Sequence, residues 1–244
     1  MHSRQGPEQA CNRLQALPWL SAMNPSQSPH ARAVLVIVGI CALIEAALTL
    51  GTGMGGQGGL RRFAFINGAF WPRLLDDWDP AWPGQPMAMF VTYAFLHGGL
   101  IHMIFNMLIL LHLGRETVDR VGQWGFVLFF MVTAAGGGAA FWLMSSASGP
   151  MVGASGAVFG LFGATMFWDW QRRNARGDEI APVLKLGVGL ILMNLILYVM
   201  VQGLLAWQAH LGGFLAGVAA AWLATPTLAH RYRPGRRPGG GGFR

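Results

Sequence analysis

The chain carries few charged side chains for its length of 244 residues. Charged residues make up 11% of it and hydrophobic residues 53%, whereas a typical soluble domain has about 25% charged residues. The mean hydropathy is +0.43. So little charge cannot cover the surface of a soluble protein of this size, which excludes an ordinary soluble enzyme and a disordered chain. We therefore expect an integral membrane protein.

Cysteine and acidic residues are also scarce. Cys11 lies in a polar tail and Cys41 in an apolar run, so no disulfide framework is expected. The shortage of acidic residues leaves a formal net charge of +7, which raises the question of nucleic acid. The basic residues, however, lie at the ends of apolar runs and in the tails rather than along one helix face, so we expect no nucleic-acid partner.

Long apolar runs are abundant. A helix of about 20 apolar residues crosses a bilayer core of about 30 Å, and six such runs lie at 31–50, 88–113, 123–145, 153–170, 183–203 and 208–226. None of them alternates with the period of two typical of membrane strands. The expected fold is an all-α integral membrane protein with a six-transmembrane-helix bundle at 31–226. Flexible tails are expected at 1–30 and 227–244, and a long external loop at 51–87.

The basic residues also predict the orientation. If the N-terminus is cytoplasmic, all but three of the 17 Lys and Arg residues fall on the cytoplasmic side, and the exceptions are Arg61, Arg62 and Arg73 in the long external loop. Cytoplasmic segments of membrane proteins carry an excess of Lys and Arg. Both termini are therefore expected to be cytoplasmic, with the basic C-terminal tail near anionic lipid.

Polar residues inside the apolar runs are functional candidates, because they cost free energy in a membrane. The second run contains His97, His102 and Asn106, the fourth opens with Ser155, and the sixth opens with His210. All three runs enter from the external side, so these groups are expected at one depth. His102 and Asn106 share a helix face, whereas His97 and His102 would diverge by about 140° on a straight helix.

Two small-residue patterns, Gly156–Gly160 and Gly213–Gly217, let helix backbones approach closely. Since Ser155 adjoins the first pattern and His210 shares a face with the second, the hydroxyl and the imidazole could come within hydrogen-bond reach. That arrangement activates a weak nucleophile.

Each of these features also has a purely structural interpretation. A lone Ser usually bonds its own helix, GxxxG is often only a packing motif, and Asn106 could tie two helices together. Three histidines could bind a metal, but no carboxylate joins them and two are expected to diverge. We therefore expect neither a metal nor a cofactor. Glu45, in the first run, is expected to bond a neighbouring helix. Four polar groups on three helices at one depth favour a functional site.

Three segments carry a family resemblance. HGGLIHMIFN in the second run, GASGAVFG in the fourth and AHLGGFLAG in the sixth resemble the motifs of rhomboid intramembrane serine proteases of the bacterial type. The resemblance covers about 31–226 and implies a six-helix bundle with a water-accessible cavity. It further implies a lipid-bilayer location in the bacterial inner membrane, and transmembrane proteins as substrates.

The resemblance also implies residue roles. Ser155 would be the nucleophile and His210 its general base, and His102, Asn106 and the backbone N–H of Ser155 would form the oxyanion hole. Supporting roles would fall to His97, Gly153 and Phe159, the last stacking on the base where relatives often have Tyr.

Two features leave alternatives open. Relatives often carry a Trp-Arg pair where this chain has Ala88 and Met89, so the resemblance does not say how the external loop is anchored. A proteolytically inactive relative that binds membrane proteins is the main alternative function, and a transporter or channel is another. A fluorophosphonate label on Ser155 would separate the protease from both.

Overall fold

The computed structural model describes residues 32–52, 59–146 and 149–231, with side chains as far as Thr225. Within these ranges the chain is almost entirely helical, as expected for an all-α membrane bundle, and the extended structure is one isolated bridge between Phe70 and Met151. The long helices are α3 (Arg32–Thr52), α6 (Leu100–Met144), α7 (Ser155–Arg176), α8 (Ala181–Met200) and α9 (Trp207–Arg231).

Three described helices, α3, α6 and α8, are long and apolar enough to cross a membrane. The protein is therefore an integral membrane protein, as predicted, while the number of six crossings stays a prediction. Helix α6 contains the second part of the expected run 88–113 and nearly all of the run 123–145, joined at Gly122, whose φ of 78° lies outside the helical region. The connection at 114–122 was expected to be a loop, but it is helical up to that kink.

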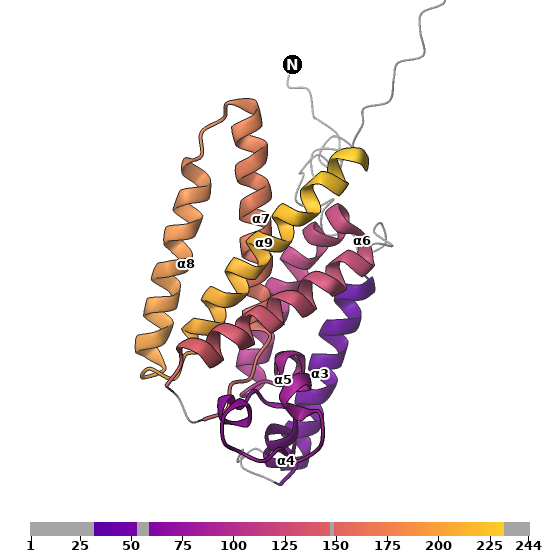
Figure 1. Cartoon of the computed structure of the whole chain (residues 1–244), viewed down its shortest axis with the longest axis vertical. Helices are drawn as coiled ribbons and strands as arrows, with labels where there is room; N and C mark the ends of the chain where they lie inside the picture. The colour runs from indigo at the N-terminus through magenta and orange to yellow at the C-terminus, as the bar shows by residue number, and fades with distance from the viewer. Residues whose placement is uncertain (1–31, 53–58, 147–148, 232–244) are drawn as a thin grey trace, which may run out of the picture.

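The helices pack around a centre formed by α6, α7 and α9 (Figure 1). Helices α7 and α9 and the two halves of α6 contact one another extensively, and α3 packs against α6. The core between them includes Leu110, Phe126, Phe130 and Leu161, all fully buried. Helix α8 stands at the edge, and Leu190 alone of its residues is buried. The bundle therefore has a well-packed centre with one loosely attached helix.

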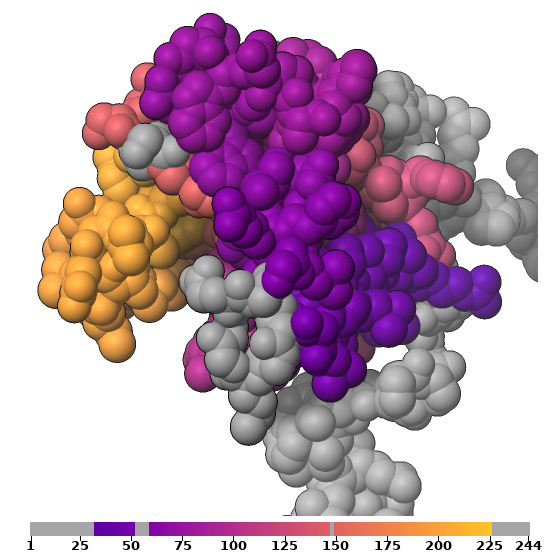
Figure 2. All heavy atoms as spheres, turned by 90° about the horizontal axis from the view of Figure 1, so that it is seen from below, coloured from indigo at the N-terminus to yellow at the C-terminus, as the bar shows by residue number. Residues whose placement is uncertain are grey.

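Short helices cover one end of the bundle. They are α4 (Gly59–Gly68), η2 (Pro72–Leu75), α5 (Gln85–Thr92) and η3 (Tyr93–Phe95), and they lie at the end opposite the turn between α7 and α8 (Figure 1). Figure 2 looks onto this end, where their purple and magenta atoms form a continuous cover beside the orange atoms at the end of α8. The expected external loop is thus largely helical, although residues 53–58 lie outside the described ranges.

Polar contacts fasten this cover together. The Gln85 amide donates to the Ile66 carbonyl at 2.6 Å, and the Thr92 hydroxyl donates to the Gly68 carbonyl at 2.7 Å. At the exposed rim, a hydrogen bond from the Arg73 guanidinium holds the pKa of the Asp77 carboxyl below its usual value. The segment therefore has a defined structure of its own above the bundle.

The expected helix at 88–113 is wrong in one respect, because the chain leaves the helical path before His97. Helix α5 ends at Thr92, η3 ends at Phe95, Leu96 is extended, and α6 restarts only at Leu100. The break coincides with a glycine pair, and Gly99 has a φ of 149° that other residues rarely adopt. His97 thus lies in a connection and not on a helix.

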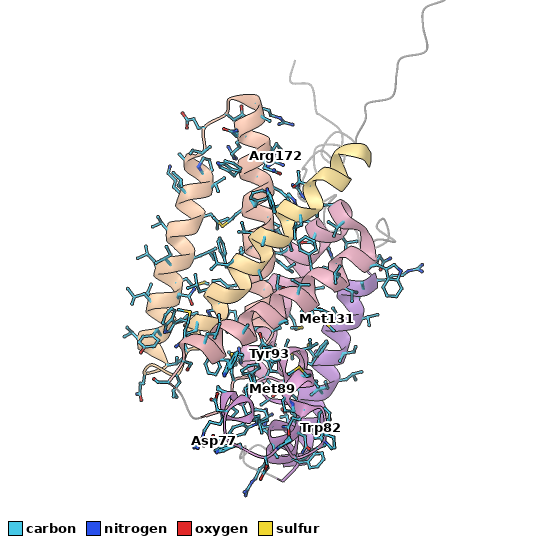
Figure 3. All side chains as sticks on the ribbon, viewed as in Figure 1. Asp77, Trp82, Met89, Tyr93, Met131 and Arg172 are labelled. Carbon is cyan, nitrogen blue, oxygen red and sulfur yellow. The ribbon has the colours of Figure 1, made fainter. Side chains whose placement is uncertain are left out.

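Other boundaries also differ from the prediction, and α7 ends at Arg176 rather than at 170. Helix α7 begins at Ser155 rather than at 153, and α9 runs to Arg231, beyond the expected end at 226. Residues 1–31 and 232–244 lie outside the described ranges, so the expectations for the tails are not tested there. Figure 3 places Arg172 toward the end of the bundle opposite Asp77 and Trp82.

Candidate active site

Ser155 lies at the start of α7, where the helix leaves a short extended segment. That segment is held in place by Met151, which exchanges two backbone hydrogen bonds of 2.9 Å with Phe70 of the short-helix cover. At a helix N-terminus the first backbone N–H groups have no partner within the helix and attract negative charge. The hydroxyl of Ser155 therefore sits beside free backbone donors.

The two residues before Ser155 are fixed by the connection between α5 and α6. The Gly153 N–H donates to the Tyr93 carbonyl at 3.0 Å, and the Ala154 N–H donates to Nε2 of His97 at 3.4 Å. His97 is fully buried, so this acceptor is shielded from water. His97 thus contacts the segment that carries Ser155, which gives it a place in the site without contact to the hydroxyl.

His102 packs directly against the same segment. A Cβ placed on Gly153, whose φ is 125°, would lie 2.7 Å from Cε1 of His102, so only glycine fits there. Nδ1 of His102 accepts the Gly98 N–H at 3.4 Å, which leaves Nε2 to carry the ring hydrogen. Asn106 is buried and donates one amide hydrogen to the His102 carbonyl at 2.9 Å, leaving the second free. Both side chains therefore keep an N–H donor.

His97 and His102 do not diverge as expected for a straight helix. Their ring centroids lie 5.3 Å apart with the rings edge to face, because the chain breaks between them. Even so, no group of three His, Cys, Asp or Glu side chains in the described ranges could hold a metal ion. Instead, His97 joins the segment before α6 to the segment before α7 through the Ala154 N–H, and the His102 ring packs beside it.

Helices α7 and α9 cross in near backbone contact. A Cβ on Gly213 would lie 1.9 Å from the Gly156 carbonyl oxygen, and one on Gly217 would lie 1.8 Å from that of Gly160. Such distances are too short for any side chain, so both crossing points require glycine. The crossing brings the first residue of α7 and the first turn of α9 to the same end of the bundle.

His210 lies in that first turn of α9 and is 5% exposed. Its ring stacks on Phe159, with centroids 4.2 Å apart and planes 6° apart. On its other side, Nδ1 lies 2.6 Å from Oδ1 of Asn194, which comes from α8. Asn194 was missed in the sequence analysis, although an amide in the middle of the apolar run 183–203 is a signal that could have found it.

Glu45 and Arg61 form a buried ion pair beside this site. Arg61 of α4 reaches the fully buried Glu45 carboxylate of α3 at 2.7 Å and also donates to the His97 carbonyl at 2.9 Å. Glu45 was expected to bond a neighbouring helix, and its partner is α4, the first helix of the short-helix cover. Arg61 was not singled out, yet it anchors the cover in a chain that lacks the Trp-Arg pair at Ala88 and Met89.

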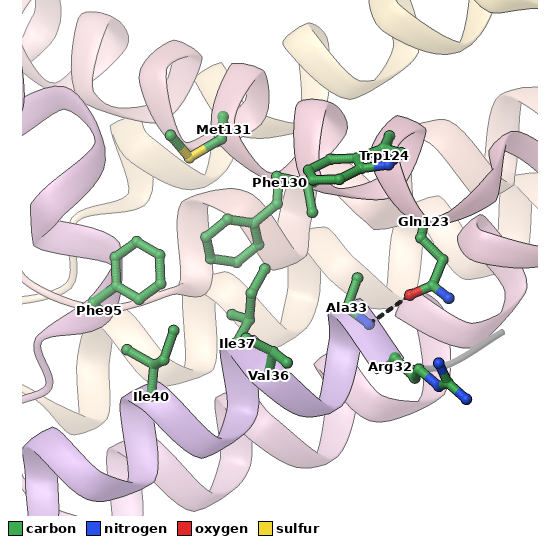
Figure 4. A pocket seen from close by; sticks show the side chains of 11 residues that line it. Arg32, Ala33, Val36, Ile37, Ile40, Phe95, Gln123, Trp124, Phe130 and Met131 are labelled. Atoms are coloured by element: carbon green, nitrogen blue, oxygen red, sulfur yellow. Dashed lines mark hydrogen bonds between the residues drawn. The ribbon is translucent and has the colours of Figure 1, made fainter. Parts of the chain in front are cut away.

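A groove of about 350 Å³ lies elsewhere, between α3 and the second half of α6 (Figure 4). Its walls are mostly apolar, and a polar contact at one end is the hydrogen bond from the Ala33 N–H to the Gln123 side chain. None of the candidate residues lines it. The groove is therefore not part of the candidate site.

Comparisons with known proteins agree in naming one family. The Rhomboid domain model matches residues 84–227. Similar proteins include Rhomboid-like protein 11, chloroplastic, of Arabidopsis thaliana, 33% identical over 59% of this chain and 53% of its own length. Rhomboid-like protease 3 of Toxoplasma gondii is 30% identical over 57% of this chain and 52% of its own. Rhomboid protease GlpG of Klebsiella pneumoniae is 31% identical over 59% of this chain and 53% of its own length. The chain thus spans about half the length of these relatives.

Proposed function

Since a match over more than half of its length shows that this chain belongs to the rhomboid family, we propose that it is an intramembrane serine endopeptidase. It cleaves transmembrane segments of membrane proteins near the outer membrane face. Ser155 is the nucleophile and His210 the general base. The observation that carries the proposal is the α7–α9 crossing, which holds Ser155 at a helix start and His210 in the adjacent helix turn.

The reaction proceeds by acyl transfer. The Ser155 hydroxyl oxygen attacks the carbonyl carbon of the scissile amide while Nε2 of His210 takes its proton. The same nitrogen gives the proton to the departing amine, and the C–N bond breaks to leave an ester on Ser155. Water then attacks the ester with His210 again as base, which frees the acid product and restores the serine.

The oxyanion of the tetrahedral intermediate needs donors that are in place before charge develops. Nε2–H of His102, the second amide hydrogen of Asn106 and the backbone N–H of Ser155 supply them. Each donor of this kind contributes about 2.7–4 kcal/mol to transition-state stabilisation. The proposal is supported by the hydrogen bonds that already engage Nδ1 of His102 and one amide hydrogen of Asn106, since they orient both groups.

Three other residues support this machinery. Gly153 lets the His102 ring lie against the segment before Ser155. His97 accepts the Ala154 N–H and so fixes the same segment. Phe159 stacks on His210 and holds the plane of its ring.

The proposed orientation follows from the basic residues. Both termini are cytoplasmic, six helical segments within 31–226 cross the membrane, and the cover at residues 59–95 lies at the outer face, where water can reach Ser155. The membrane is the inner membrane of a bacterium, and one of the relatives is bacterial. Substrate helices must unwind locally, because their carbonyls are already hydrogen-bonded, so segments rich in Gly, Ala, Ser or Pro are preferred.

The test is cleavage of a model transmembrane substrate by purified protein in detergent. Ser155→Ala and His210→Ala should abolish cleavage while the protein stays folded. Ser146→Ala, at an exposed serine in the connection between α6 and α7, is the matched control and should cleave at the wild-type rate. Cleavage retained in Ser155→Ala would overturn the proposal. Substrate binding without cleavage by the wild type would favour the inactive-relative alternative.

A further inference from the structure

Helix α8 carries one amide side chain, Asn194, among apolar residues that are mostly exposed. Asn194 lies six residues before the end of α8 at Met200, and His210 lies three residues after the start of α9 at Trp207. At 1.5 Å per residue these positions are about 9 Å and about 4.5 Å from the same end of the bundle. The two positions differ in depth by about one helical turn, and the side chains bridge that difference, since Nδ1 of His210 and Oδ1 of Asn194 lie 2.6 Å apart.

The hydrogen bonds of Asn194 settle which way its amide points. Its Nδ2 donates to the Leu190 carbonyl one turn earlier at 3.2 Å, and a carbonyl oxygen could not replace the amide nitrogen there. Oδ1 therefore faces His210, and it accepts a hydrogen bond from Nδ1 at 2.6 Å. With the ring hydrogen on Nδ1, the neutral imidazole has its lone pair on Nε2.

A lone pair on Nε2 is what a general base needs in order to accept a proton from a serine hydroxyl. In the other tautomer Nε2 carries hydrogen and cannot act, and loss of the orienting partner lowers the rate steeply in proteases that have one. Phe159 holds the ring plane, but a stacked ring can still flip about its Cβ–Cγ bond and exchange tautomers. Asn194 supplies the contact that distinguishes the two ring nitrogens.

We infer that Asn194 is a positioning residue for His210, so that the site works as a Ser–His–Asn triad drawn from three helices. This inference rests on the proposed function. The Nδ1–H···Oδ1 bond holds the productive tautomer before the reaction, and it stabilises the imidazolium once Nε2 has taken the Ser155 proton. Because α8 is otherwise weakly attached to the bundle, the base is oriented only while α8 stays docked.

The experiment combines kinetics with a direct readout of the ring. Asn194→Leu removes the acceptor at similar size, Asn194→Asp keeps an acceptor, and Leu190→Ala removes the buried apolar contact of α8 while leaving the amide in place. For each variant, kcat, KM and Tm are measured in detergent. The ¹⁵N resonances of the His210 ring, assigned by subtraction with His210→Gln, report the tautomer.

Asn194→Leu should lower kcat by about 10–10²-fold with KM nearly unchanged, and its His210 resonances should move away from the Nδ1–H form. Asn194→Asp should keep kcat within about tenfold of wild type, and the acidic limb of its pH profile should move to higher pH, because a carboxylate favours the protonated ring.

An unchanged tautomer in Asn194→Leu would overturn the inference and leave Asn194 as a contact between helices. So would an equal loss of kcat in Leu190→Ala with its His210 resonances still in the Nδ1–H form. The ring resonances can be measured whether or not the protein cleaves anything. Failure of the protease proposal and failure of the positioning role are therefore distinguishable.

Discussion

Arg61→Ala should destabilise the fold far more than it changes the chemistry. Glu45 is fully buried, and its carboxylate is 2.7 Å from the Arg61 guanidinium. Without Arg61, the carboxylate would keep the hydrogen bond from the Thr49 hydroxyl at 3.3 Å but would lose its cation. The tie from Arg61 to the His97 carbonyl would be lost as well. Removing one partner of a buried pair costs about 3–5 kcal/mol, which corresponds to a fall in Tm of about 6–20 °C for a chain of this size.

The assay is thermal unfolding in detergent followed by tryptophan fluorescence. Arg62→Ala, an exposed neighbour on the same helix, is the matched control and should leave Tm almost unchanged. A double change of Glu45 and Arg61 to Leu removes both charges together, so it should cost much less than the sum of the single changes.

The kinetics of the same variants separate anchoring from catalysis. Glu45→Gln should lower kcat of the folded protein by less than about tenfold, whereas loss of a true triad carboxylate costs about 10⁴. Equal Tm values for Arg61→Ala and Arg62→Ala would refute the anchoring argument. A loss near 10⁴ in Glu45→Gln at unchanged stability would show that the first helix contributes a catalytic group.

Three further predictions concern the site and the helix crossing. Gly217→Ala should push α9 away from the Gly160 carbonyl and lower both Tm and yield in the membrane, which a change at an exposed α9 residue should not do. Asn106→Ala should lower kcat by about 10²–10³ with little change in KM, since an oxyanion donor acts mainly in the transition state; a fall in Tm with a proportionate loss of active protein would instead mark a structural amide. Gly153→Ala should displace the His102 ring, because the added Cβ would lie 2.7 Å from its Cε1 atom. The variant should therefore show a clear fall in kcat with only a small fall in Tm.

The fold class and the family were predictable from local patterns. Apolar runs long enough to cross a bilayer occur throughout the chain, and the all-α membrane fold follows from them. The motifs in the second, fourth and sixth runs carried the resemblance that the family comparison confirms. Both depend on residues close together in the sequence, where one sequence is informative.

The break before α6 was predictable in part. The pair Gly98–Gly99 interrupts an otherwise apolar run, and glycine there permits the φ of 149° that ends the helical path. Apolarity alone conceals the break, because the flanking residues are as hydrophobic as those of a continuous helix. The same break brings His97 beside His102, which a straight helix would prevent.

Contacts between distant helices were not predictable. The pairing of Glu45 with Arg61 depends on how α4 folds back over the end of α3, and no local pattern encodes that return. Asn194 has no periodic partner in its own run, and its bond to His210 depends on the rotation of α8 against α9. Such contacts are set by packing around the glycine crossing, which one sequence indicates only as a tendency to approach closely.

The central claim is that Ser155 is a nucleophile activated by His210. The measurement that tests it most directly is mass spectrometry of the wild-type protein after treatment with a fluorophosphonate, which bonds covalently to activated serines. We predict one adduct per chain, located on the peptide that contains Ser155, and its absence in both Ser155→Ala and His210→Ala. No adduct on folded wild-type protein, or an adduct that persists at the same rate in His210→Ala, would contradict the account.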